Sequence, residues 1–242
     1  MSRTTKDDRR PEAPAGPSTD VYLRHVAHDL RAPLNAIVGW AELLKAGQLS
    51  PEDAVRAGTT IVRHSRLLSQ RIGDALDVWR LDSGLLHVAL RPVSVGPALR
   101  AAVDAARPQF ESRQVTCRLD IQAERSADLD SARLVQALTL LLADAAVNTS
   151  AGQSVDVRMT APDGRVEVAI EGGGLVPNER AFARDPADTR PEANVRAYNF
   201  GLSLARALVT MQGGTLDVAP ADDKRVAFVI GWKAAVSTSH HP

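Results

Sequence analysis

A histidine followed directly by an acid, with a proline five residues after the histidine, is the arrangement in this sequence best suited to chemistry. Asp29 can accept a hydrogen bond from one ring nitrogen of His28, which fixes the tautomer and raises the nucleophilicity of the other nitrogen. Pro33 lacks an N–H and its ring collides with the carbonyl of Asp29, so a helix should bend there. The spacing predicts a reactive histidine on a bent helix. An ordinary exposed His–Asp pair beside an incidental proline is the alternative.

The segment around His28 has the apolar repeat of a helix that packs along a seam. Apolar residues recur at alternating steps of three and four: Leu23, Val26, Leu30, Pro33, Ile37, Trp40 and Leu44. His28 falls off this seam and should point outward. Capping residues at 18–20 and a glycine at 47 set the expected ends of the helix.

A second amphipathic helix is expected from Pro51 to about Asp82, because proline and acids suit a first turn and Ser83-Gly84 suits an exit. Its predicted apolar face comprises Ile61, Leu68, Ile72, Ala75, Leu76 and Trp79. Two such helices on a short loop form an antiparallel hairpin. Because a lone hairpin leaves apolar surface in water, we expect a dimer that forms a four-helix bundle.

After residue 85 the pattern changes to short strands and helices. Strands are expected at 86–90, 115–121, 154–160, 165–170, 215–218 and 225–230, and helices at 94–112, 129–147 and 199–211. This mixture, with antiparallel hairpins, predicts an α+β sandwich of one sheet under a helical layer.

The composition indicates where the domains begin and end, and it excludes some classes of function. We expect a disordered tail at 1–18, the helical hairpin at 19–85, the α+β domain at 86–235 and a second tail at 236–242. Lys+Arg and Asp+Glu both total 29, which argues against electrostatic binding of the whole chain to nucleic acid or to an anionic membrane. No apolar run reaches the length of a membrane span, and one cysteine excludes an internal disulfide, so we expect a soluble, cytoplasmic protein.

Several ordered motifs give the sequence a family resemblance. Residues 28–34 resemble the phosphoacceptor box of bacterial sensor histidine kinases, and 61–86 look like the second helix of their dimerisation and histidine-phosphotransfer domain. Residues 132–138 match the run that leads into the asparagine box of their ATP-binding domain, of the gyrase–Hsp90–histidine kinase type. The similarity covers about residues 20–235. It implies that His28 is the phosphoacceptor, that Asp29 orients it and serves as acid/base, and that Pro33 bends the helix.

The resemblance also implies a Mg-ATP site, and the sequence departs from the family at each part of it. The asparagine that ligates Mg²⁺ is Asp144 here, an earlier asparagine is Leu140, and the usual lysine is Val147. Asp144 keeps an oxygen ligand that suits Mg²⁺, but it adds negative charge beside the phosphates.

Two glycine motifs of the same site are also altered. The motif D-x-G-x-G aligns with residues 171–175, so that Glu171 replaces the adenine-binding aspartate, Gly173 keeps one glycine and Leu175 replaces the other. The phosphate-cradling motif G-x-G-L-G-L keeps only Gly201, and the lid at 178–198 lacks glycine.

These departures favour a phosphorelay protein that carries a phosphoryl group on His28 and exchanges it with an aspartate of a response regulator receiver domain. An active ATP-dependent kinase, and a non-enzymatic module that binds kinases or regulators through the bundle, are the alternatives. The departures argue against bound Mg-ATP, and Asp144 is expected to be a metal ligand only if nucleotide binds. We expect the bundle to pair with a second copy or with another kinase. Ala32 stands where the family positions water for dephosphorylating the regulator, which predicts weak phosphatase activity.

Overall fold

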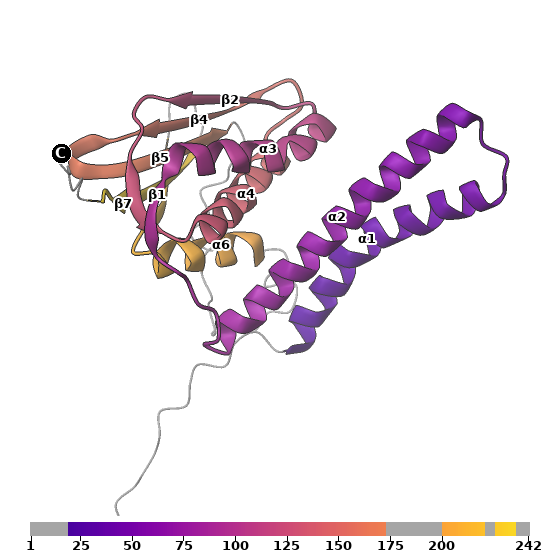
Figure 1. Ribbon diagram of the computed structural model, residues 1–242, viewed down its shortest axis with the longest axis horizontal. Helices are drawn as coiled ribbons and strands as arrows, with labels where there is room; N and C mark the ends of the chain where they lie inside the picture. Colours follow the sequence, from indigo (N-terminus) through magenta and orange to yellow (C-terminus); the bar gives the residue numbers. More distant parts are fainter. Residues whose placement is uncertain (1–18, 173–199, 221–225, 236–242) are drawn as a thin grey trace, which may run out of the picture. The chain divides into compact units, whose positions relative to one another are not determined.

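The computed structural model describes residues 19–172, 200–220 and 226–235, and Figure 1 shows the order of their elements. The chain divides into two compact units, with the boundary in the continuous chain between Ala75 and Leu76. Within the described ranges, none of the helices has the length and apolar character needed to span a bilayer.

The first unit is a helical hairpin made of α1 (Thr19–Lys45) and most of α2 (Pro51–Asp82), which agrees with the predicted helices. Gly47, at φ +66°, follows the end of α1. Ser50 begins α2, because its Oγ accepts a hydrogen bond from the Asp53 N–H at 3.1 Å. Local capping therefore fixes both ends of the loop between the helices.

The predicted apolar face of α2 is in fact divided between two seams. Ile61, Leu68 and Ala75 are half-buried, as expected for contact within the hairpin. Ile72, Leu76 and Trp79 are 43–54% exposed. The difference arises because a 3–4 repeat can be followed along two neighbouring stripes of one helix, and only one of them faces α1.

The second unit contains a five-stranded sheet in the order β2-β4-β5-β7-β6. The strands are β2 (Thr116–Ile121), β4 (Ser154–Thr160), β5 (Arg165–Gly172), β6 (Thr215–Pro220) and β7 (Val226–Lys233). β2 and β4 are parallel, and the other neighbours are antiparallel. Helices α3 (Val95–Arg113), α4 (Ser131–Asn148) and α6 (Phe200–Met211) lie along one face of the sheet (Figure 1). This is the α+β sandwich that the sequence predicts.

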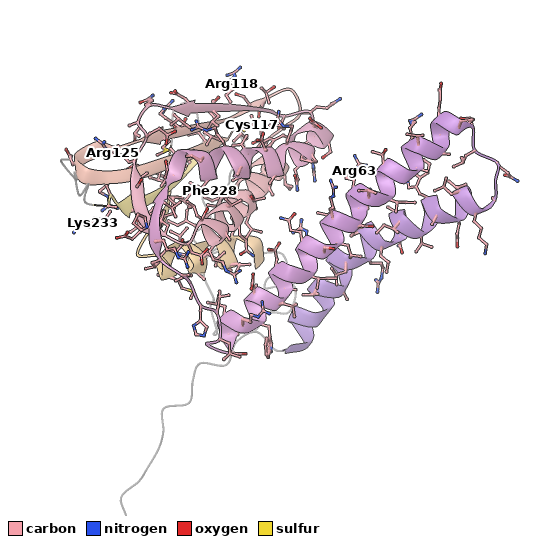
Figure 2. The ribbon with its side chains drawn as sticks, viewed as in Figure 1. Arg63, Cys117, Arg118, Arg125, Phe228 and Lys233 are labelled. Carbon is pink, nitrogen blue, oxygen red and sulfur yellow. The ribbon has the colours of Figure 1, made fainter. Side chains whose placement is uncertain are left out.

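Strand alternation decides which side chains face the helices. Val166, Val168 and Ile170 of β5 are fully buried, and so are Val155 and Met159 of β4. The alternate residues, Glu167 and Ala169 on β5 and Asp156 and Arg158 on β4, are half-buried or exposed. Figure 2 shows the same alternation on β2, where Arg118 points away from the helices and Cys117, the preceding residue, does not. We call the side of the sheet opposite the helices its outer face.

The strand predicted at 86–90 is wrong. That stretch forms no strand, and the Ala89 N–H donates to Asp130 Oδ2 at 3.0 Å instead of to a neighbouring strand. The strand is displaced to β1 (Arg91–Ser94), which pairs antiparallel with β3 (Ser126–Leu129) in a separate two-stranded sheet. Between β4 and β5, the predicted turn is a 3-10 turn, Pro162–Gly164.

Candidate functional site

The predicted phosphoacceptor segment lies on a continuous helix. His28, Asp29 and Pro33 all belong to α1, and the Pro33 ring is buried. Helical spacing puts residue 28 on the same stripe as Ala32 and Asn35, both of which are exposed. The side chains of residues 28 and 29 lie outside the described part of the structure. The backbone is therefore the one that the motif requires, and the bend at Pro33 stays a prediction.

Asp144, the predicted metal ligand, is half-buried near the end of α4. Its Oδ2 accepts a hydrogen bond from Asn148 Nδ2 at 3.0 Å, and Asn148 Nδ2 also donates to the Asp144 carbonyl at 2.9 Å. Leu140, one turn earlier, is buried in the core, and Val147 is half exposed to solvent. The carboxylate is thus an oxygen donor suited to Mg²⁺, and position 147, where the resemblance implies a lysine, holds a valine.

Glu171 does not face the helices. It is a residue of the outer face, where its Oε1 lies 3.3 Å from Nη1 of Arg158 on the neighbouring strand. A second cross-strand pair, Arg118–Asp156 at 3.7 Å, lies on the same face. Because successive side chains alternate, the residue of β5 that faces the helices beyond Ile170 is Gly172, which is buried. The last inward position of β5 therefore has no carboxylate.

Gly201 lies in the first turn of α6, and this helix packs against α4. Asp144 and Gly201 thus belong to neighbouring helices on one face of the sheet, whereas Glu171 belongs to the other face. Gly173, Leu175 and the lid at 178–198 lie outside the described residues. Two of the three described nucleotide-site positions therefore lie on helices that pack against each other, and the third lies on the opposite face of the sheet.

One polar cluster was not singled out by the sequence analysis. Asp77, on α2, is 5% exposed and belongs to the second unit. Its Oδ2 accepts hydrogen bonds from Arg133 Nη1 at 2.5 Å and from Gln136 Nε2 at 3.0 Å, and its Oδ1 accepts from Arg80 at 3.2 Å. Two features of the sequence could have indicated this cluster. One is an acid directly before Val78, a buried residue of α2. The other is an arginine and a glutamine one turn apart, shortly after Asp130, which caps α4.

The electrostatics of this cluster favour the ionised carboxylate. Burial acts to raise the pKa of Asp77, but the hydrogen bonds from Arg133 and Gln136, the positive charge of Arg133 and the bond from Arg80 outweigh it, so the pKa is lowered. Asp130 is similar. Burial acts to raise its pKa, and hydrogen bonds from the N–H groups of Ala89, Arg133 and Ala132 bring it below the ordinary value.

Among the described residues, no group of three or more His, Cys, Asp and Glu side chains is placed to hold a metal ion. A cavity of about 420 Å³ opens between α3 and the edge strand β2, where Phe110, Arg107 and Cys117 help to line it. Asp144, Glu171 and Gly201 do not line this cavity. It is therefore separate from the predicted nucleotide positions.

A helical hairpin followed by this sandwich is also the fold of solved histidine kinase structures. Histidine kinase AdeS of Acinetobacter baumannii matches with a TM-score of 0.56 at 16% identity, over 85% of this chain and 97% of that chain. Full-length ShkA, solved in complex with AMPPNP, matches at 0.57 and 24% identity, over 88% of this chain and 45% of that one. A bacterial phosphotransferase matches at 0.50 and 17% identity, over 90% of this chain and 98% of that one.

Sequence comparison leads to the family. Residues 21–84 match the His Kinase A (phospho-acceptor) domain. The probable sensor histidine kinase TcrY of Mycobacterium tuberculosis is 31% identical over 208 residues, which is 81% of this chain and 42% of TcrY. Histidine protein kinase DivJ of Caulobacter vibrioides is 27% identical over 202 residues, 81% of this chain and 34% of DivJ. The chain belongs to the sensor histidine kinase family of two-component signalling proteins, and it spans less than half the length of these two curated relatives.

Proposed function

We propose that the chain is a phosphorelay phosphotransferase. His28 carries the phosphoryl group and exchanges it with an aspartate of a response regulator receiver domain, and the second unit does not drive the reaction with ATP. The membership of the family and the match of residues 21–84 to a phospho-acceptor domain support a histidine phosphotransfer role. One observation favours the phosphotransferase over the autokinase: the inward position at the end of β5 is Gly172, and Glu171 is on the outer face.

The absence of an acid at that inward position bears directly on nucleotide recognition. In the family that the sequence resembles, a strand-end carboxylate accepts a hydrogen bond from the adenine amino group. Glu171 is paired with Arg158 across the outer face, so a nucleotide between α4 and α6 does not meet its carboxylate. An adenine there would lose a charge-assisted hydrogen bond, which is worth about 1.5–3 kcal/mol.

The environment of Asp144 supports the same conclusion. Its Oδ2 accepts a hydrogen bond from Asn148, and position 147, where the resemblance implies a lysine, is an exposed valine. A triphosphate would therefore bring its negative charges beside a carboxylate. The donor set at Asp144 fits Mg²⁺, but the set at the end of β5 does not fit adenine.

The proposed exchange needs few groups from this chain. The unprotonated ring nitrogen of His28 forms a bond to phosphorus as the bond from phosphorus to the receiver aspartate oxygen breaks, and the aspartate leaves as a carboxylate. Asp29 would hold the proton of the other ring nitrogen and stabilise the positive charge that develops on the ring. The reverse transfer uses the same groups. The proposal includes two partners, which are a receiver domain and a second hairpin. It also includes a cytoplasmic location.

The test is phosphorylation of the full chain with labelled phosphate from two donors. We expect no label from Mg-ATP, and label from a phosphorylated receiver domain that disappears in His28→Gln. Label from ATP that is lost in His28→Gln would identify an autokinase and overturn the proposal. If several receivers give no His28-dependent label, the chain is instead a binding module.

Equilibrium dialysis with labelled ATP and Mg²⁺ tests whether the chain binds nucleotide at all. We expect no saturable binding at micromolar ATP. Saturable micromolar binding that Asp144→Ala abolishes and Glu171→Gln preserves would show that the site works without the strand-end acid. Loss of such binding in Glu171→Gln would show that the outer-face placement does not describe the nucleotide-bound state.

A further inference from the structure

One edge of the five-stranded sheet has no described strand beside it. β2 is the outermost strand of the sheet, and among the described strands only β4 pairs with it (Figure 1). The N–H groups of Thr116 and Gln122 donate to carbonyls in and next to β4 at 3.0 and 2.9 Å. Because successive residues of a strand direct their backbone groups to opposite sides, the residues whose N–H and C=O groups point to this open edge are Cys117, Leu119 and Ile121.

The charges of β2 fit a second copy of the same strand. Arg118 and Asp120 are exposed and lie on either side of Leu119. When two copies of β2 run antiparallel with the two Leu119 residues opposite each other, each Arg118 faces Asp120 of the other copy. In the same register the backbone groups at the open edge meet donor to acceptor, Leu119 with Leu119 and Cys117 with Ile121.

The two neighbouring registers put like charges together. A pair centred on residue 118 has two arginines opposite each other, and a pair centred on residue 120 has two aspartates opposite each other. Like charges directly opposite destabilise a strand pair, and opposite charges stabilise it. The sequence of β2 therefore selects one antiparallel register among the three.

Helix α3 carries a second self-complementary pattern beside the same edge. Four exposed residues, spaced four, three and four positions apart, share one side of the helix and alternate in charge: Arg100, Asp104, Arg107 and Glu111. We call them the charged stripe. Read in the opposite direction, the stripe has the opposite sign at every position. An antiparallel second copy therefore places an acid opposite each arginine.

The arginines of the charged stripe already have exposed partners within one copy. Arg107 pairs with Asp104, and Arg100 pairs with Glu124. Exposed pairs of this kind contribute little to stability. A guanidinium has five N–H donors, so it can bind a carboxylate of a second copy as well. The internal pairs are therefore compatible with a contact between copies.

One two-fold axis serves both patterns. All four residues of the charged stripe line the cavity together with Cys117 and Leu119, so β2 runs back alongside α3. Leu119 lies about 10 Å from the start of β2. The middle of the stripe, between Asp104 and Arg107, lies about 11 Å from the end of α3. An axis perpendicular to the sheet at Leu119 therefore also passes near the middle of the charged stripe.

The cavity between α3 and β2 adds an apolar component to the contact. Phe110 and Val115 in its lining are buried, and Leu119 is half-buried. In the selected register, Leu119 of the second copy lies opposite Leu119 on the side of the strands that faces the helices. Pairing thus removes apolar surface from water at the open edge.

We propose that β2 pairs with β2 of a second copy through its open edge, with Leu119 opposite Leu119 and the two charged stripes facing each other. The sheet then continues across two sandwiches. This contact is separate from the four-helix bundle expected for the hairpin, and because it is small it should be the weaker of the two. The inference goes beyond the proposed function and does not depend on it, because its residues neither carry the phosphoryl group nor belong to the nucleotide site.

Exchanging the charges of β2 tests the register. The background is the full chain with Val38→Glu and Val62→Glu, which charge exposed apolar positions of the hairpin and weaken association through the bundle. Sedimentation over a range of concentrations should still show a dimer. Arg118→Asp should raise its dissociation constant about 10-fold, because aspartates then face each other at two places. Arg118→Asp/Asp120→Arg should restore the parent value, since the exchange recreates both opposite-charge pairs.

A control and a second site complete the test. Lys233→Glu reverses an exposed charge on β7, three strands away from β2, and should leave the dissociation constant unchanged. Glu111→Arg puts two like charges together where the charged stripe meets Arg100 of the second copy. It should weaken the dimer several-fold. Because it leaves β2 intact, it also tests the proposal if the β2 variants fail to fold.

Four outcomes would overturn the proposal. A background variant that stays monomeric at every concentration leaves the open edge to a segment of a different protein. A dimer that Arg118→Asp does not weaken is held elsewhere. A dimer that the double exchange does not restore uses another register. An unchanged dissociation constant in Glu111→Arg means that the two α3 helices do not face each other.

Discussion

At the scale of single residues, Asp77 stays ionised inside the second unit because donors surround its carboxylate. Burial alone would raise its pKa, and Arg133, Gln136 and Arg80 reverse that effect. Since the folded-state pKa lies below the unfolded value of about 3.8, the carboxylate stabilises the fold above that pH. The stabilisation is lost as the pH falls through the folded pKa.

Asp77→Asn should therefore lower the free energy of unfolding by about 2 kcal/mol at pH 7, since it leaves Arg133 without its charge partner in a partly buried setting. The difference in the free energy of unfolding between the parent and the variant should narrow as the pH falls below 3.8, where the parent aspartate also becomes neutral. Urea unfolding at both pH values measures this. The control Asp128→Asn should change stability by less than about 0.5 kcal/mol. A gap that is constant with pH would argue against an ionised Asp77.

Cys117 gives a second prediction at this scale. Burial raises the pKa of its thiol to about 11, while the positive charge of Arg107 lowers it by a smaller amount and the negative charge of Asp156 raises it slightly. The thiolate is the reactive form, so at pH 8 the thiolate fraction should be about 100-fold below that of a thiol with a pKa of 9. Because Cys117 is the only cysteine of the chain, absorbance with a disulfide reagent reports it alone. Reaction at the rate of the urea-unfolded chain would contradict the prediction.

At the end of β5, the sequence predicts a residue type, and the structure adds the face of the sheet on which that residue lies. The motif comparison aligned Glu171 with the adenine-binding aspartate by residue type, and this assignment stays a prediction. The buried alternation of Val166, Val168 and Ile170 was already visible in the sequence, and it puts Gly172 on the inward side. A shift of one residue along a strand moves a side chain to the other face of the sheet, so residue type alone does not tell which face it occupies.

At the scale of elements, the turn after α6 depends on the absence of a side chain. The N–H groups of Gln212 and Gly214 both donate to the Val209 carbonyl, and Gly213 adopts φ +69°. A Cβ on Gly214 would lie 2.4 Å from Nε1 of the buried Trp232. The chain can thus pass from α6 into β6 only because position 214 is glycine.

Gly214→Ala should accordingly destabilise the second unit by about 2 kcal/mol, because a rigid buried indole must move to make room. Gly213→Asn, in the same turn, meets no neighbour, and asparagine tolerates a positive φ, so its cost should stay below about 1 kcal/mol. Thermal unfolding of both variants compares them directly. Equal melting temperatures for the two variants would exclude the steric explanation.

The long elements were predictable, and the shortest strands were not. Capping residues and long apolar repeats located α1, α2 and α4 to within two residues of their ends. The β1–β3 pair was missed because each strand has four residues, and Pro92 and Ser126 give no strand pattern. Their pairing depends on a contact between distant segments, which local periodicity does not record.

At the scale of the whole molecule, the hairpin leaves a second apolar seam exposed. It comprises Leu34 and Val38 on α1 and Val55, Val62 and Ile72 on α2, each 43–70% exposed. Val55 and Val62 are seven residues apart, the repeat of a helix that packs along a partner. Exposed apolar stripes of this kind favour association, and the predicted four-helix bundle would cover this one.

The full chain should therefore associate, and charges placed on the exposed seam should prevent it. In Val38→Glu/Val62→Glu, we expect the dissociation constant of the dimer to rise about 100-fold, which corresponds to about 2.7 kcal/mol. Sedimentation over a range of concentrations measures it. Val147→Glu introduces the same change at a half-exposed valine of α4 and should leave association unchanged. If the double variant dimerises as strongly as the parent, the contact between copies does not use this seam, and the bundle prediction is wrong.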